Sequence, residues 1–329
     1  MKTFFRLLGS ELERFSARRM ARVLLIIAVG IGVLVGTITF LVTDDHSAPD
    51  SATVQECYED LEQWGLEESE KREVCSDWGD DRFHLTWLLG ESTEDWSETR
   101  PTPEPNRTEP FRGLEGILPL IGGLLAVLTG GLVGASFFGA EYRFGTIEQV
   151  LLWEPRRNRV LLAKYLTTFL GSALVAITGS LAIAFSLWPT AVAKGTTQGV
   201  DARFWIDLLS TAGRIGIAAG LLGVISGTVA IFTRHTAGAV MSLLGYQLIG
   251  GIIINIWIKW LAPWDPLFNA TAFLSESDTT KWVKQREFGQ TYWTEVSANS
   301  YLTAGLIAFA IASAFALGGF IVFNRRDVA

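Results

Sequence analysis

Residues 23–43 read VLLIIAVGIGVLVGTITFLVT and contain no charged side chain. A helix needs about 20 apolar residues to cross the hydrocarbon layer of a bilayer, so this stretch predicts a transmembrane helix over 21–43. A cleaved signal peptide would have a shorter apolar core that ends in a small-residue cleavage site. The run here is longer, and Glu11 and Glu13 lie in the segment before it, which argues against a signal peptide.

The rest of the chain continues this pattern. Only 19% of the 329 residues are charged, while 49% are hydrophobic; soluble proteins usually carry about 25% charged residues. Further apolar segments lie at 117–138, 161–187, 207–232, 237–258 and 301–323. The sequence therefore predicts an all-α integral membrane protein with six transmembrane helices. Their frequent glycines predict close packing, because small residues let helix backbones approach each other in lipid.

The distribution of charge predicts the orientation in the membrane. Basic residues gather before the first span, in the 139–160 connection, at Arg234 between the fourth and fifth spans, and in the tail 324–329. Cytoplasmic segments are enriched in Lys and Arg. Six alternating spans place all four segments on one side, so we expect cytoplasmic termini in a multi-pass protein of a plasma or inner membrane. The opposite side then receives 44–115 and 259–300.

Residues 1–22 are expected to form an interfacial helix. Phe4, Leu8, Leu12 and Phe15 recur at helical spacing, and arginines lie between and beyond them. A basic amphipathic helix of this kind lies along the membrane surface with its apolar face in the lipid. We therefore expect the N-terminus to contact membrane lipids before the chain enters the first span.

Residues 44–115 are predicted to form a large acidic external loop between the first and second spans. This loop holds 21 acidic and 6 basic residues, whereas the rest of the chain is net basic. It also holds Cys57 and Cys75, the only cysteines of the chain. We expect them to form a disulfide, since an external compartment is oxidising. Their spacing relative to His46 and His84 matches no usual zinc pattern, so no metal site is expected.

Familiar enzyme motifs are absent from the sequence. It contains neither a G-x-x-x-x-G-K-[ST] phosphate loop nor an H-E-x-x-H zinc motif, and it has no G-x-S-x-G nucleophile elbow. No compact basic patch with interleaved aromatic residues is present, so nucleic acid is not an expected partner. The chain is therefore predicted to be non-catalytic and to hold no cofactor of its own.

Residues 134–166 carry most of the functional argument. They read GASFFGAEYRFGTIEQVLLWEPRRNRVLLAKYL and lie between the second and third predicted spans. Gly145 is expected to break the emerging helix, Thr146 to cap a new short helix, and Pro155 to end it. This helix would present apolar side chains to the cytoplasm, which predicts a partner surface. These side chains are Ile147, Val150, Leu151 and Trp153.

This stretch resembles the signature of type-2 ATP-binding-cassette permeases, the membrane subunits of many bacterial and archaeal exporters. The matching features are E-x-x-x-G-T at 141–146, the apolar run that follows, Pro155, Arg159 and the later Lys164. The N-terminal SELERFSARRMAR is similar to the interfacial helix before the first span of these proteins, and the C-terminal FNRRDV is similar to their usual ending. Six spans is also the number typical of the family, so the resemblance covers most of the chain. The large acidic loop is the main departure.

The resemblance implies that this chain would transport the substrate and that a separate subunit would hydrolyse ATP. The helix around Thr146–Trp153 would be the coupling helix that docks into a groove of a separate ATPase subunit, and Glu141, Gly145, Pro155 and Arg159 would shape this connection. Two permease copies, either identical or related, would pair with two ATPase subunits, which bind ATP and magnesium. Substrate would then cross at the permease interface by alternating access, and the 259–300 segment would form short external helices that gate the exit.

Three polar residues within the predicted spans are candidates for lining a pathway: Arg214, Gln247 and Asn255. For Arg214 the alternative is a side chain that extends to the outer interface, and for the other two it is a hydrogen bond between helices.

A second function class is an ion-coupled secondary transporter, or a membrane sensor that uses the external loop. Secondary transporters normally have ionisable residues or interrupted helices near the membrane midplane, often in two related halves. The sequence shows no internal repeat and no acidic residue near the centre of a span.

Overall fold

Long apolar helices dominate the structure. The computed structural model describes residues 2–43, 83–89, 117–197, 199–250, 264–276, 279–287 and 290–325, together with residues 55, 58 and 253. Within these ranges, five helices are long and apolar enough to cross a membrane. The chain therefore has the make-up of a multi-pass membrane protein of mainly helical structure.

The five long helices are α2 (Arg19–Val42), α5 (Ile117–Phe144), α7 (Arg157–Lys194), α8 (Ala202–Thr233) and α12 (Tyr301–Arg325). The shorter helical elements of the described ranges are α1 (Lys2–Ala17), η1 (Leu85–Leu88), α6 (Thr146–Trp153), α9 (Thr236–Gly245), η3 (Tyr246–Gly250) and α11 (Pro266–Ser275). The strands of the same ranges are β1 (Phe83–His84), β2 (Gly195–Thr196), β3 (Thr279–Glu287) and β4 (Gln290–Asn299).

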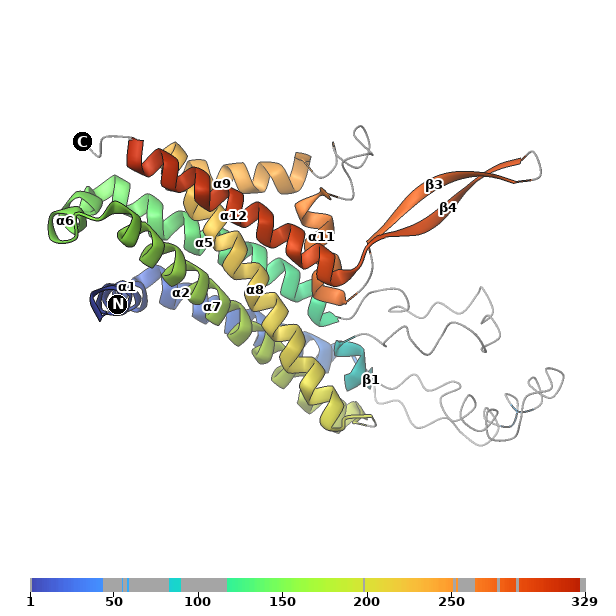
Figure 1. The fold of residues 1–329 in the computed structure, drawn as a ribbon. Coiled ribbons are helices and arrows are strands. Elements are labelled where there is room, and N and C mark those ends of the chain that lie inside the picture. The colour runs from blue at the N-terminus through green and yellow to red at the C-terminus, as the bar shows by residue number, and fades with distance from the viewer. Residues whose placement is uncertain are drawn as a thin grey trace.

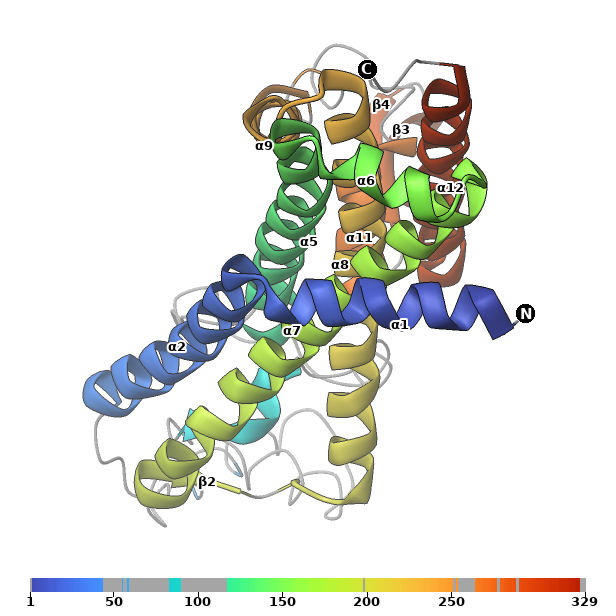
Figure 2. The same cartoon turned by 90° about the vertical axis from the view of Figure 1, so that its left-hand side faces the viewer.

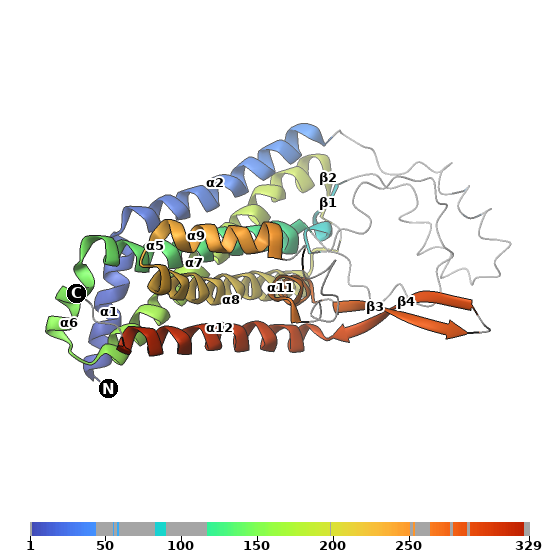
Figure 3. The ribbon, with the colours of Figure 1, turned by 90° about the horizontal axis from the view of Figure 1, so that it is seen from above.

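The long helices and α9 run along one another as a bundle (Figure 1, Figure 3). Helix α1 crosses one end of this bundle, in an orientation that suits a helix on a membrane surface (Figure 2). The same end carries α6 and both chain termini, and we call it the α6 end. Strands β3 and β4 project from the opposite end, which we call the hairpin end (Figure 1).

Five of the predicted spans are confirmed as long helices, namely 21–43, 117–138, 161–187, 207–232 and 301–323. Helices α7 and α8 have 38 and 32 residues, so both extend beyond the length that a bilayer requires. The predicted span 237–258 begins as α9 and η3, but most of its remainder lies outside the described residues. The count of six spans and their orientation therefore stay predictions.

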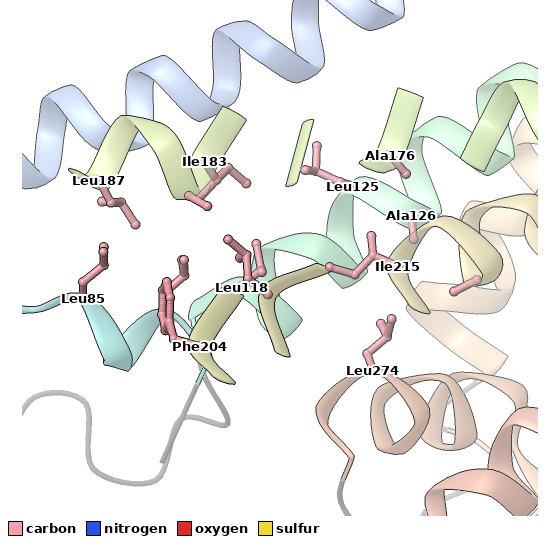
Figure 4. Close-up of a cluster of buried hydrophobic side chains, with 14 of the residues drawn as sticks. Leu85, Leu118, Leu125, Ala126, Ala176, Ile183, Leu187, Phe204, Ile215 and Leu274 are labelled. Carbon is pink, nitrogen blue, oxygen red and sulfur yellow. The ribbon is translucent and has the colours of Figure 1, made fainter. Parts of the chain in front are cut away.

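One part of the hydrophobic core lies toward the hairpin end (Figure 4). Leu85 and Leu88 of η1 are almost fully buried there, in a cluster with Leu187 and Phe204. Strand β1 adds a short parallel pairing with β2 at the end of α7. Residues 83–89 of the predicted external loop are thus part of the packing of the bundle.

An aromatic cluster fills the core of the α6 end. The ring of Phe137 lies with its centroid 5.9 Å from that of Phe15 in α1, and the rings of Phe138 and Tyr165 are 5.4 Å apart. Phe323, near the end of α12, is buried in the same cluster. These contacts join α1, α5, α7 and α12 at the end where α6 lies.

Glycines bring α5 and α8 together, as the sequence predicts. A Cβ atom on Gly130 or Gly134 would overlap backbone atoms of α8. The hydroxyl of Ser226 in α8 donates a hydrogen bond of 2.6 Å to the carbonyl oxygen of Gly131. Close backbone contact and this interhelical hydrogen bond hold the pair together, since lipid supplies no hydrophobic drive for helix association.

The prediction of short helices throughout 259–300 is wrong in its second half. Pro266–Ser275 is a helix, but Thr279–Glu287 and Gln290–Asn299 pair as an antiparallel hairpin in which Trp282 lies opposite Glu295. Both segments are rich in Thr, Val, Trp and Tyr, which favour a pleated strand over a helix. The predicted all-α class therefore describes the bundle but not this hairpin.

The α5–α8 contact generates a stability prediction. We expect Gly134→Ala to lower the free energy of unfolding by about 1–3 kcal/mol, because the added methyl group forces two backbones apart. Thermal unfolding of the purified protein in detergent measures the change. Gly131→Ala is the matched control, since its Cβ would meet Leu243 at an ordinary contact distance of 3.4 Å. Equal effects of the two substitutions would contradict the assigned packing.

Candidate functional site

The chain turns sharply between α5 and α6 at Gly145. Its φ of 63° lies in the left-handed region, which side chains other than glycine adopt only with strain. The predicted break at Gly145 is thus confirmed. The predicted cap is wrong: Thr146 is the first residue inside α6, and the residue at the cap position is Gly145, which has no side chain to cap with.

The end of α6 is equally well defined. Glu154 leaves the helix in an extended conformation, and its N–H still donates to the carbonyl of Val150 at 3.0 Å. Pro155 follows, and a residue before proline disfavours helical backbone, which agrees with the extended Glu154; α7 begins at Arg157. Helix α6 is therefore a single short element with a fixed corner on each side.

The two faces of α6 differ in exposure. Ile147 and Val150 lie three residues apart on one face and are buried, with Ile147 only 3% exposed. Leu152 and Trp153 are 84% and 90% exposed, and Phe144 beside the corner is also exposed. Leu151 is half-buried between these faces. Ile147 and Val150 therefore anchor α6 to the bundle, and the prediction that they face outward is wrong. Trp153 does face outward.

Glu141 lies one turn before the corner and is buried. Its Oε1 accepts a hydrogen bond from Lys164 Nζ at 2.7 Å and another from Arg18 Nη2 at 3.0 Å. Lys164, two turns into α7, has a side chain that is 1% exposed, and its Nζ also donates to Glu11 Oε2 of α1 at 2.9 Å. Glu11, Arg18, Glu141 and Lys164 form what we call the ionic cluster.

Phe137 and the carbonyls of α5 complete the surroundings of the ionic cluster. The Arg18 guanidinium lies 4.5 Å from the centroid of the Phe137 ring, and Lys164 Nζ lies 5.2 Å from it. Arg18 also donates to the carbonyl oxygen of Phe137 at 3.1 Å. The cluster therefore joins α1, the end of α5 and the start of α7. At its exposed edge, Arg14 adds a third positive charge and pairs with Glu11 Oε1 at 3.0 Å.

A buried ionic cluster is a poor source of net stability but a strong constraint on geometry. Removing charges from water costs several kcal/mol per ion, which their mutual attraction repays only in good geometry. Any movement that separates Lys164 from either carboxylate would leave an unpaired charge in the interior. The corner of α5 and α6 is thus bound to α1 and α7 as one unit.

Sequence reasoning missed Glu11 and Arg18 as members of the site and treated Lys164 only as a basic residue of the connection. The signal was the spacing of Glu11, Phe15 and Arg18, which follow one another at four and three residues and share a helix face. An acid in the middle of an otherwise apolar face predicts a buried partner.

The first turn of α7 also binds the end of α12. Arg157 Nη1 donates to the carbonyl oxygen of Phe323 at 3.2 Å, and Asn324 Nδ2 donates to Asn158 Oδ1 at 2.6 Å. Arg159, predicted to shape the connection, is half-buried in this turn, and Pro155 is exposed beside it. The predicted coupling residues therefore do come together at one end of the bundle.

The predicted pathway residues lie elsewhere. Arg214 is mostly buried in α8, where its Nη2 donates to Thr211 Oγ1 at 2.8 Å and its guanidinium pairs with Glu276 after α11. The side chain is therefore held between helices and does not extend freely to the interface. The side chain of Gln247 and the whole of Asn255 lie outside the described part of the structure, as do Cys57 and Cys75 of the predicted disulfide.

No family model, curated protein or solved structure matches this chain. Within the described residues, no group of three or more His, Cys, Asp or Glu side chains could hold a metal ion. The α6 end is thus the candidate site on its geometry alone: a short, rigidly anchored helix that exposes two large apolar side chains.

The ionic cluster predicts a large effect of Lys164→Met. The substitution leaves two buried carboxylates without their shared cation, so we expect the free energy of unfolding to fall by about 3–5 kcal/mol. Denaturant unfolding in detergent, followed by circular dichroism, measures it.

Lys194→Met at the opposite end of α7 is the matched control. Among the described residues, its Nζ donates to the carbonyl oxygen of Thr43 at 2.8 Å and lies 4.8 Å from the centroid of the Phe40 ring, and it pairs with no carboxylate, so the loss should be clearly smaller. The triple change Glu11→Gln, Lys164→Met and Glu141→Gln should recover part of the stability, because no fully buried charge is then left unpaired; Arg14 and Arg18, which lose a carboxylate partner, are 51% and 27% exposed. A triple variant less stable than Lys164→Met would refute the assigned pairing.

Proposed function

We propose that this chain is the membrane-spanning permease subunit of an ATP-binding-cassette exporter and that α6 is its coupling helix. The observation that carries the proposal is the exposure of Leu152 and Trp153 on a short helix whose other face is anchored in the bundle. Large apolar side chains that are 84% and 90% exposed at the end of a bundle are typical of a surface that binds a partner.

The surroundings of α6 support a partner that does mechanical work. The helix is bounded by the Gly145 corner and by Pro155, and the ionic cluster ties the corner to α1 and α7. A force applied to Trp153 is therefore transmitted to several long helices and is not lost in a loose loop. A plain connecting loop between two spans requires none of these features.

The proposed mechanism assigns the chemistry to the partner. Two ATPase subunits bind ATP and magnesium, and each receives α6 of one permease copy in a surface groove. Closure of the ATPase dimer displaces α6, and α1, α5 and α7 follow because the ionic cluster moves as a unit. The two permease copies, identical or related, then alternate between inward and outward openings for a substrate. This chain would hold no cofactor and would act in a bacterial or archaeal plasma or inner membrane.

Removal of the exposed apolar surface tests the docking of α6. We expect the combined change Leu152→Ser and Trp153→Ser to reduce the amount of ATPase subunit that co-purifies under gentle extraction by about tenfold or more, because tryptophans at interface centres carry much of the binding energy. Quantitative mass spectrometry of the complex and its ATP hydrolysis rate give the measurement.

Trp264→Ser is the control, since Trp264 is an exposed tryptophan away from α6 and just before α11. A wild-type complex that contains no ATPase subunit would favour the secondary transporter or the sensor. Equal loss of ATPase with Trp264→Ser would show that α6 is not the docking element.

The Gly145 corner provides a second test. Gly145→Leu forces a branched side chain into the left-handed region, at a cost of about 1–2 kcal/mol, so we expect α6 to lose its orientation and the ATPase to dissociate while the protein still inserts. Gly145→Asn should keep most of the association, because asparagine tolerates this conformation. No atom lies within 4 Å of a Cβ at this position, so bulk alone cannot explain a difference between the variants.

A further inference from the structure

A cavity of about 330 Å³ lies at the α6 end, between the last turns of α5 and the start of α9. Its walls are formed by Gly139 and Arg143 of α5 and by five residues between His235 and Met241. The absence of a side chain at Gly139 lets the start of α9 come close, since a Cβ there would overlap Thr236. The cavity includes no residue of α6 or of the ionic cluster.

One side of this cavity carries positive charge and hydrogen-bond donors. Arg143 is exposed and forms no ion pair within the described part of the chain. The nearby Glu141 pairs with Lys164 and Arg18 and not with Arg143. His235 accepts the N–H of Ala237 on Nδ1 at 3.1 Å, so its ring proton is on Nε2, which is left as a donor.

The other side of the cavity is apolar. Val240 is half-buried and Met241 is 68% exposed, and both lie beyond the polar groups, about one turn further along α9. From the end of the bundle inward, the wall therefore changes from cationic to apolar. A phospholipid has the same order, with an anionic headgroup at the surface and acyl chains below it.

We propose that this cavity binds an anionic phospholipid, with the lipid phosphate between Arg143 and His235 and an acyl chain along Val240 and Met241. Arginine binds phosphate oxygens by charge-assisted hydrogen bonds, and basic pockets between membrane helices suit anionic headgroups. The apolar wall distinguishes a lipid from a free phosphate ion. The proposal does not depend on the partner ATPase.

Lipid retention by the purified full-length chain tests the site. The protein is equilibrated in detergent with equal amounts of phosphatidylglycerol and phosphatidylcholine, and native mass spectrometry gives the ratio of the two bound lipids. We expect Arg143→Gln to lower the preference for phosphatidylglycerol by about fivefold, the effect of one basic residue near an anionic lipid. Arg203→Gln, an exposed arginine at the start of α8, should leave it unchanged.

A second pair of variants guards against misfolding. Ala237→Glu places an acid in the cavity wall and should lower the preference by a similar factor; an acid in the first turn of a helix stabilises that helix, so α9 should remain folded. Ala237→Gln adds the same bulk without charge and should retain phosphatidylglycerol.

Three outcomes would overturn the proposal. One is an unchanged preference in Arg143→Gln and Ala237→Glu. Another is an equal loss in Arg203→Gln, which indicates diffuse charge rather than a site. The third is displacement of the lipid by millimolar inorganic phosphate, which shows that a small anion is the occupant.

Discussion

The buried ammonium group of Lys164, held between the carboxylates of Glu11 and Glu141, is the contact on which the α6 end depends. It joins α1, the end of α5 and the start of α7. Because an unpaired charge in this interior would cost several kcal/mol, the three elements have few ways to separate. The corner at Gly145 and the anchored face of α6 are therefore held in place relative to α1, α5 and α7.

The two ends of the bundle are stabilised by different physics. At the hairpin end the core is mostly aliphatic, with Phe83 and Phe204 among its buried residues, and includes η1, a short piece of the long acidic segment (Figure 4). At the α6 end, aromatic rings, buried charges and interhelical hydrogen bonds replace it. Charged contacts tolerate only discrete arrangements, whereas aliphatic contacts can slide. The α6 end is thus the better suited of the two to pass on a displacement as a rigid unit.

Much of the bundle could be predicted because its cause is local. An uncharged run of about 20 residues has few alternatives to a spanning helix, and Gly145 and Pro155 both disfavour helix where α6 begins and ends. The hairpin was missed because its segments carry both helix-compatible charges and strand-favouring aromatic residues, and the partner that decides between them lies on the neighbouring strand. The predicted cap at Thr146 was wrong because the turn at Gly145, which favours glycine, places Thr146 inside the helix.

The sequence by itself determined the long apolar helices, the amphipathic helix α1 and the corner that isolates α6, since hydropathy and backbone conformation depend on neighbouring residues. Only the tertiary structure decided that Glu11, Arg18, Glu141 and Lys164 meet, that Ile147 and Val150 face inward while Trp153 faces out, and that Arg143 and His235 share a cavity. Several of these contacts join residues more than 80 positions apart. The charged contacts contribute strongly to the free energy of folding only after burial has removed water from the charges.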